Sequence, residues 1–82
     1  MKIDAFVAIK NNLHDKVVTD FCNVQVDIDY VEDNEDSVNE WIRQELENIF
    51  HVPVMNEDFE VHNMTEILEN IAFDEFESKF LS

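Results

Sequence analysis

From Asp20 to Glu77 the chain carries eighteen acidic residues and a single basic one, Arg43. Over all 82 residues, twenty Asp and Glu stand against five Lys and Arg, which gives a formal net charge of −15 with His neutral. These carboxylates have too few internal cations to pair with, and their mutual repulsion opposes a compact state. A net charge of about 2–8 is enough to keep a small domain soluble. We therefore expect the excess charge to serve binding, with solubility as the alternative.

The apolar content is nevertheless sufficient for a folded core. Hydrophobic residues make up 45% of the chain, with seven Phe among them, so a wholly disordered chain is not expected. The length predicts one domain that spans residues 1–82. Cys22 is the only cysteine and has no internal disulfide partner. The chain shows neither a signal segment nor an apolar run of membrane-spanning length, which predicts a cytoplasmic protein.

Two extended segments open the chain. The alternation of apolar and polar residues in Met1–Lys10 predicts a strand, and Asn11-Asn12 is typical of a turn. A second extended segment is expected from Lys16 to Val31. Its inward residues are expected to be Val24, Val26, Ile28 and Tyr30.

Phe21 lies on the opposite parity to Val24, so the second segment does not alternate cleanly. A β-bulge near Cys22 or Asn23 would bring both residues to the same side, because one extra residue reverses the facing of a strand. The alternative is a short helix over Leu13–Phe21, which the β-branched residues at 17–19 disfavour.

Two helices are expected in the remainder of the chain. Ser37 and Glu40 form an S-x-x-E capping box, and His51-Val52-Pro53 ends the first helix. Its apolar face consists of Val38, Trp41, Ile42, Leu46, Ile49 and Phe50. Phe59–Val61 predicts a short edge strand, and Asn63 is expected to cap the second helix. The sequence therefore predicts an α+β fold, in which a β-hairpin with a short third strand packs two helices on one face.

The second helix has an unusually broad apolar stripe. Met64, Ile67, Leu68 and Ile71 follow one line together with Glu75, and Ala72 and several aromatic residues widen it. We expect these side chains to be core. The alternative is a homodimer face or a docking surface, formed by Phe73, Phe76, Phe80 and Leu81.

No pattern of catalytic or metal-binding residues is present. The chain contains no glycine, which phosphate-binding loops and nucleophile elbows require. Cys22 lies among acids that raise a thiol pKa, and His14, His51 and His62 lack metal-ligand spacing. The acids from Asp27 onward do not fit a calcium-binding loop. We therefore expect no enzyme activity, no cofactor and no metal.

The charge also limits the choice of partner. Direct binding of nucleic acid needs clustered Lys and Arg, and anionic lipid repels an acidic surface. A row of carboxylates can instead imitate a phosphate backbone, since outward residues on a strand repeat at about 6.6–6.8 Å. The partner would then be a protein with a basic surface that handles nucleic acid. The residues expected to bind it are Asp27, Asp29, Glu32, Asp33, Glu35, Asp36, Glu40 and Glu47, with Glu66, Glu69 and Glu77 as a second row.

In length, acidity, single-domain character and lack of catalytic motifs, the chain resembles small virus-encoded inhibitors of bacterial defence, such as anti-CRISPR and DNA-mimic proteins. The resemblance implies an inhibitor that occupies a basic channel of its target in the host cytosol. A small assembly module that dimerises or docks through the apolar residues of the last helix is the alternative.

Overall fold

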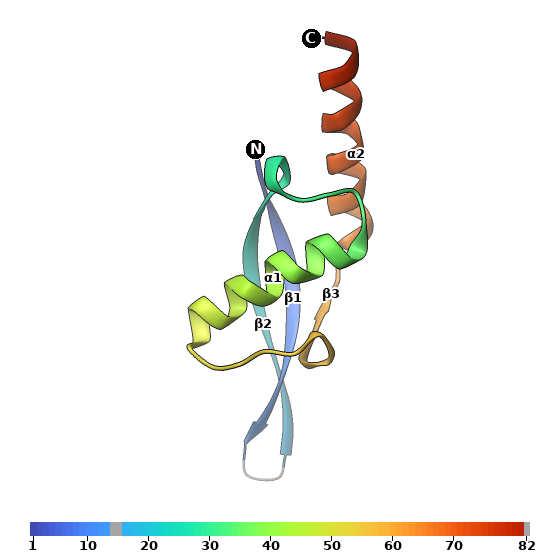
Figure 1. The fold of residues 1–82 in the computed structure, drawn as a ribbon. Helices are drawn as coiled ribbons and strands as arrows, with labels where there is room; N and C mark the ends of the chain where they lie inside the picture. The colour runs from blue at the N-terminus through green and yellow to red at the C-terminus, as the bar shows by residue number, and fades with distance from the viewer. Residues whose placement is uncertain (14–15, 82) are drawn as a thin grey trace.

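The computed structural model describes the backbone of residues 1–13 and 16–81 and the side chains of residues 1–10 and 19–77. A β-hairpin of β1 (Lys2–Leu13) and β2 (Lys16–Asp27) comes first. It is followed by the 3₁₀ turn η1 (Ile28–Tyr30) and helix α1 (Glu35–Phe50). A second 3₁₀ turn η2 (Asn56–Asp58), strand β3 (Phe59–Val61) and helix α2 (Met64–Leu81) complete the chain. The α+β class is therefore confirmed (Figure 1).

The three strands form one antiparallel sheet in the order β2-β1-β3. The β1–β2 register runs without interruption from the pair Lys2–Asp27 to the pair Leu13–Lys16. The β-bulge expected near Cys22 is therefore wrong. The turn expected at Asn11-Asn12 is also wrong, because β1 continues through both residues to Leu13.

The unbroken register leaves Phe21 on the outer face of the sheet. Phe21 pairs with Ala8, and its side chain is 75% exposed. Its ring meets the ring of His62 edge-on, with the centroids 6.0 Å apart. A bulge would have buried Phe21, but a three-stranded sheet covered on one face leaves the other face to water.

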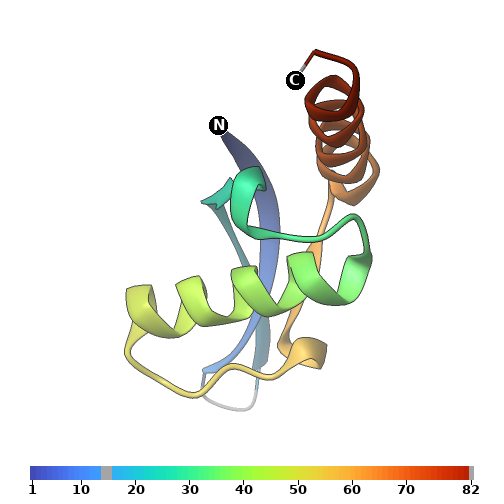
Figure 2. The same cartoon turned by 45° about the horizontal axis from the view of Figure 1, so that its top comes forward.

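α1 crosses the inner face of the hairpin, and α2 stands at the end of the sheet and extends beyond it (Figures 1 and 2). Val38, Ile42 and Leu46 are the buried residues of α1, and Ile67 and Ile71 are those of α2. Both helices join the same apolar cluster. From the strands and turns this cluster includes Ala5, Val7, Val24, Val26, Ile28, Val54 and Phe59.

α1 begins earlier than the sequence pattern indicates. Its N-cap is Asn34, whose side-chain oxygen accepts a hydrogen bond from the Ser37 backbone N–H at 2.8 Å. The Ser37 hydroxyl accepts instead from the Glu32 backbone N–H at 2.9 Å. The capping box expected at Ser37 and Glu40 is therefore wrong, because Asn34 is an equally good cap three residues earlier.

The second extended segment ends at Asp27 and does not reach Val31. The Asp27 carboxylate accepts a hydrogen bond from the Asp29 backbone N–H at 3.2 Å, which starts the η1 turn. Ile28 remains buried as expected, whereas Tyr30 is 77% exposed and stacks on Trp41 with ring centroids 6.5 Å apart. The expected inward position of Tyr30 is therefore wrong.

Asn63 joins β3 and α2 to the central strand. It directly precedes α2, and its backbone carbonyl accepts from the Ile67 N–H at 3.1 Å, but its side chain bonds β1 and not the first turn of the helix, so the expected side-chain cap is wrong. Its side-chain oxygen accepts from the Phe6 backbone N–H, and its side-chain nitrogen donates to the Asp4 carbonyl, both at 2.8 Å. The His62 backbone N–H donates to the Phe6 carbonyl at 2.8 Å, and the Asn63 amide thus continues the β1–β3 ladder past His62 and sets where α2 begins.

We expect the substitution Asn63→Ala to lower the free energy of unfolding by about 2 kcal/mol, because it leaves two backbone groups of β1 without their partners. Urea unfolding followed by circular dichroism would measure this loss. The matched control is Asn56→Ala, since Asn56 is an exposed asparagine elsewhere and should change the value by less than about 0.5 kcal/mol. Equal effects of both substitutions would contradict this role for Asn63.

α1 ends in a left-handed residue that is not glycine. His51 has φ 57° and ψ 33°, and its backbone N–H donates to the Glu47 carbonyl at 2.8 Å. Glycine is the usual residue at such a C-terminal cap, because a Cβ disfavours this conformation by about 1–2 kcal/mol. The chain contains no glycine, so His51 takes this position with its Cβ in place.

The substitution His51→Gly should therefore raise the free energy of unfolding by about 1 kcal/mol, since it relieves the left-handed strain. The measurement is the urea concentration at the midpoint of unfolding, with the dependence of the unfolding free energy on urea unchanged. His51→Ala is the control, because it removes the imidazole and keeps the Cβ, and it should bring no gain. A gain of the same size in His51→Ala would show that the imidazole, not the backbone, is responsible.

Candidate interaction surfaces

The loop before α1 and the first turn of this helix carry exposed carboxylates of the expected site. Asp33, Glu35 and Asp36 are exposed. In the part of the chain that the structure describes, their side chains make no ion pair or hydrogen bond. We call these three residues the acidic front. They lie at the positive end of the helix dipole, which favours carboxylates there and offsets some of their mutual repulsion.

Two residues of the expected site already form ion pairs within α1. The Arg43 guanidinium binds Glu40 at 2.6 Å and also binds Glu47, one turn to either side. The hydrogen bond from Arg43 holds the pKa of Glu40 below its usual range. Arg43 thus compensates part of their charge, and Glu40 and Glu47 have less free charge to offer a partner than the acidic front has.

Asp27 and Asp29 lie beside the N-terminal amine of Met1. The amine is 2.8 Å from Asp29 and 3.7 Å from Asp27. Its hydrogen bond to Asp29 raises the pKa of the amine and lowers that of Asp29. Because Asp29 lies in a 3₁₀ turn, the two carboxylates do not have the strand spacing on which the expected phosphate-like row depended.

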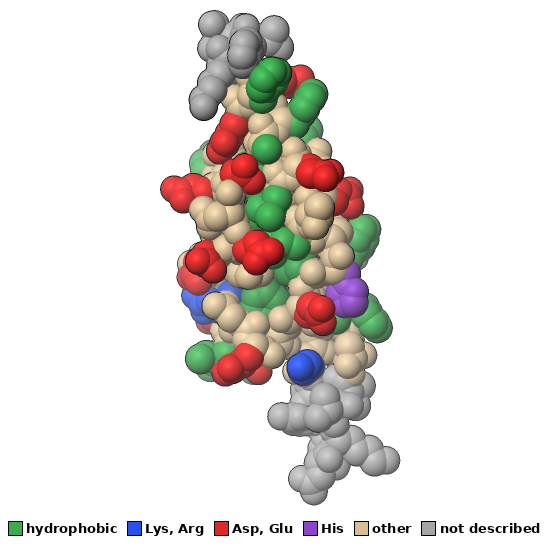
Figure 3. Space-filling view, turned by 90° about the vertical axis from the view of Figure 1, so that its right-hand side faces the viewer, with side chains coloured by type: hydrophobic (Ala, Val, Ile, Leu, Met, Phe, Trp, Pro, Cys, Tyr) green, Lys and Arg blue, Asp and Glu red, His purple; other side chains and the backbone are tan. Residues whose placement is uncertain are grey.

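Asp74 connects the acids of the first half of the chain with those of α2. Its carboxylate contributes to the pKa shifts of both the Met1 amine and Asp29, so α2 places it at η1. Glu66, Glu69 and Glu77 lie exposed on the same helix. Figure 3 shows the side of the molecule that lies to the right in Figure 1. Acidic side chains surround hydrophobic ones over most of this side, with Lys, Arg and His only in its lower part. Sequence reasoning missed Asp74, because only the fold brings it to Asp29.

The aromatic residues of α2 are surface residues where the structure describes them. Phe73 is 63% exposed and Phe76 is 58% exposed, so the expectation that they are core is wrong. The reason is that α2 extends beyond the sheet, and its contacts with the core end at Ile71. Phe80 and Leu81 belong to the same expected surface, but their side chains lie outside the described residues.

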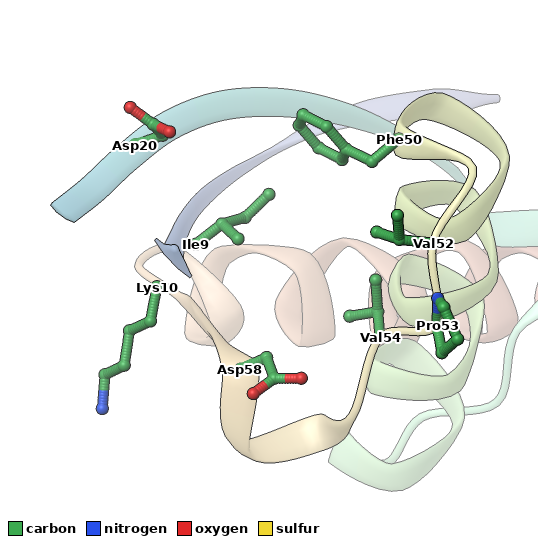
Figure 4. A pocket seen from close by; sticks show the side chains of 8 residues that line it. All are labelled: Ile9, Lys10, Asp20, Phe50, Val52, Pro53, Val54 and Asp58. Atoms are coloured by element: carbon green, nitrogen blue, oxygen red, sulfur yellow. The ribbon is translucent and has the colours of Figure 1, made fainter. Parts of the chain in front are cut away.

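A hollow of about 440 Å³ lies between the hairpin and the chain that follows α1. Apolar side chains of Ile9, Phe50, Val52, Pro53 and Val54 line it, and Lys10, Asp20 and Asp58 stand at its edge (Figure 4). Sequence reasoning did not predict this hollow. The helical pattern places Phe50 on the apolar face of the helix, whereas its side chain is 45% exposed.

The described residues show neither a metal-binding cluster nor a membrane-spanning helix. No group of three or more His, Cys, Asp or Glu side chains among them is placed to hold a metal ion. None of the helices, over their described length, is long and apolar enough to cross a membrane. Comparison of the chain with protein-family models, with curated proteins and with solved structures gave no match.

Cys22 is a half-buried free thiol on the inner face of the sheet. Burial raises the pKa of this thiol, and the nearby Asp20 carboxylate raises it further. The thiolate is the reactive form, so we expect Cys22 to react slowly with an aromatic disulfide at neutral pH. The pH at half-maximal rate should lie above that of the urea-unfolded chain. Asp20→Asn should lower this midpoint without removing the whole shift, and a native midpoint at or below the unfolded one would contradict the assignment.

Proposed function

We propose that this protein is an inhibitor that binds a basic, nucleic-acid-binding surface of a target protein and blocks it. The observation that supports the proposal is the uncompensated charge of the folded surface. Within the described part of the chain, ion pairs are made by only two cations, Arg43 and the N-terminal amine. The remaining carboxylates are held in water, with no charged residue among the buried ones described.

The sign of the charge selects the kind of partner. A surface of this potential attracts Lys- and Arg-rich surfaces over long range and accelerates association with them. Proteins that handle nucleic acid carry such surfaces, because they must neutralise phosphates. Bound carboxylates would then exclude nucleic acid by competition, as expected from the resemblance to DNA-mimic inhibitors.

The acidic front is the part of this surface that we expect to make the first contacts. Its carboxylates are exposed, lie close together and have no internal cation. Asp27 and Asp29 are already paired with the amine, so they contribute less. The working surface is therefore centred on the start of α1 rather than on the end of β2.

The experiment is capture of targets from a bacterial lysate at low salt, followed by elution at high salt. Each eluted protein is then tested for binding of labelled DNA or RNA with and without the acidic protein. We expect a target that leaves at high salt and loses its nucleic acid in competition, because exposed charge pairs are screened by salt. Salt-resistant capture, or unchanged nucleic-acid binding, would contradict the proposal.

Neutralising the acidic front tests which acids matter. The triple variant Asp33→Asn, Glu35→Gln, Asp36→Asn should weaken target binding about tenfold at low salt, if each lost pair contributes about 0.5 kcal/mol. The matched control is Glu45→Gln, Glu57→Gln, Glu60→Gln, which removes the same charge elsewhere. A similar loss in both variants would show that net charge alone governs binding.

The exposure of Phe73 supports a second candidate function, an assembly module that docks through α2. Apolar surface of this kind marks interaction sites when several such residues are contiguous, and Phe76 lies one turn away. Association through this surface would tolerate salt, since it does not depend on charge. The low- and high-salt capture therefore separates the two functions directly.

A further inference from the structure

The chain has one long segment without charge. Asn48–Asn56 contains no Asp, Glu, Lys or Arg, whereas 30% of all residues are charged. Four of the ten exposed large hydrophobic residues among those described fall within it, namely Ile49, Phe50, Val52 and Met55. Loss of charged residues together with exposed apolar side chains is typical of the centre of a protein interface.

This segment forms one wall of the hollow. Phe50 and Val52 stand on either side of the left-handed turn at His51, and both line the hollow. Figure 4 shows their side chains with those of Ile9 and Val54 around a common space. The volume of about 440 Å³ falls in the range of about 300–1,000 Å³ that is usual for ligand pockets. The opposite wall is Ile9 of β1, and Ile9 and Val54 join the hollow to the core.

The edge of the hollow carries more negative than positive charge. Asp20 on β2 and Asp58 on η2 stand at opposite sides of it, and Lys10 extends away from the hollow (Figure 4). Asp58 is held in place, because one of its oxygens accepts from the Met55 backbone N–H at 3.0 Å. A ligand with an apolar group and adjacent cations therefore matches both the lining and the edge.

We propose that this hollow binds one large apolar side chain, flanked by Lys or Arg, from a basic segment of the target protein. The inference rests on the proposed function and gives it a point of attachment that charge alone does not supply. Interfaces concentrate much of their affinity in a few apolar or aromatic residues seated in pockets. The acids steer the target, and the anchored side chain slows its release.

The test uses short peptides as probes, so it does not depend on knowing the target. The ¹⁵N-labelled protein is titrated at physiological salt with the blocked tripeptide Lys-Phe-Lys. We expect backbone amide shifts centred on Ile9, Phe50, Val52 and Val54. Burial of the Phe ring should make the affinity about tenfold higher than that of Lys-Ser-Lys, and Glu-Phe-Glu should bind more weakly than Lys-Phe-Lys.

Two variants locate the site. Val52→Ser removes an exposed lining side chain and should lower Lys-Phe-Lys affinity several-fold. Met55→Ser is the matched control, because Met55 is equally exposed in the same segment and does not line the hollow. Both variants should keep the unfolding midpoint of the parent chain, which shows that the fold is intact.

Several outcomes would overturn the proposal. Equal affinity for Lys-Phe-Lys and Lys-Ser-Lys would show that charge alone binds the peptide. Equal affinity for Glu-Phe-Glu would indicate a site for apolar ligands without charge selection, and shifts confined to α2 would place the site there. Absence of shifts at millimolar peptide would also overturn it. Salt-dependent capture of a target would still stand in each case, so failure of this inference and failure of the proposed function are distinguishable.

Discussion

The packing of Val38, Ile42 and Leu46 against the inner face of the hairpin holds the rest of the structure in place. All three side chains are fully buried, and they meet Val7, Val24 and their neighbours without a polar group between them. The path of the chain after α1, the position of η2 and the start of β3 all follow from where this helix lies. A domain of this size has little other apolar surface to bury, so this contact accounts for much of its stability.

The same packing determines where the charges can lie. Because one face of a three-stranded sheet and one stripe of each helix fill the core, no described carboxylate is fully buried, and even the Asp27 side chain keeps 17% of its surface exposed. The fold offsets a few of them locally, through Arg43, the N-terminal amine and the dipole of α1. Most of the repulsion remains in the free protein, and a basic partner would relieve it. Binding therefore costs such a surface less free energy than it costs a surface whose charges already form internal ion pairs.

Periodicity explains which parts of the fold the sequence predicts. The alternation in β1 and the helical stripe of α1 predict both elements, and the short strand at Phe59–Val61 is also confirmed. The errors arise where one local pattern competes with another. Asn34 and Ser37 both make good caps, and the Asp27 side chain converts an apparent strand into a turn. These choices depend on contacts with other segments, which alternation cannot reveal.

The candidate surfaces were less predictable for a related reason. The charge itself is evident from the sequence, but the pairing of Glu40 and Glu47 by Arg43 and the approach of Asp74 to Asp29 need the fold. The sequence predicts a bulge only if Phe21 faces the same side as Val24. Phe21, Phe50 and Phe73 are all exposed, since the small sheet gives large side chains too few positions inside.

β2 is an edge strand, and Trp41 covers part of its open side. The indole N–H of Trp41 donates to the Gln25 carbonyl at 3.0 Å. Residues two positions apart on a strand present their backbone groups to the same side, so Asn23 and Phe21 continue this edge beyond the indole. An open edge of this kind can pair with the edge strand of another copy of the chain. Here mutual repulsion of the acidic chains is the main barrier to such pairing. The ionic strength that would release the proposed basic partner would therefore also weaken the protection against self-assembly into larger sheets.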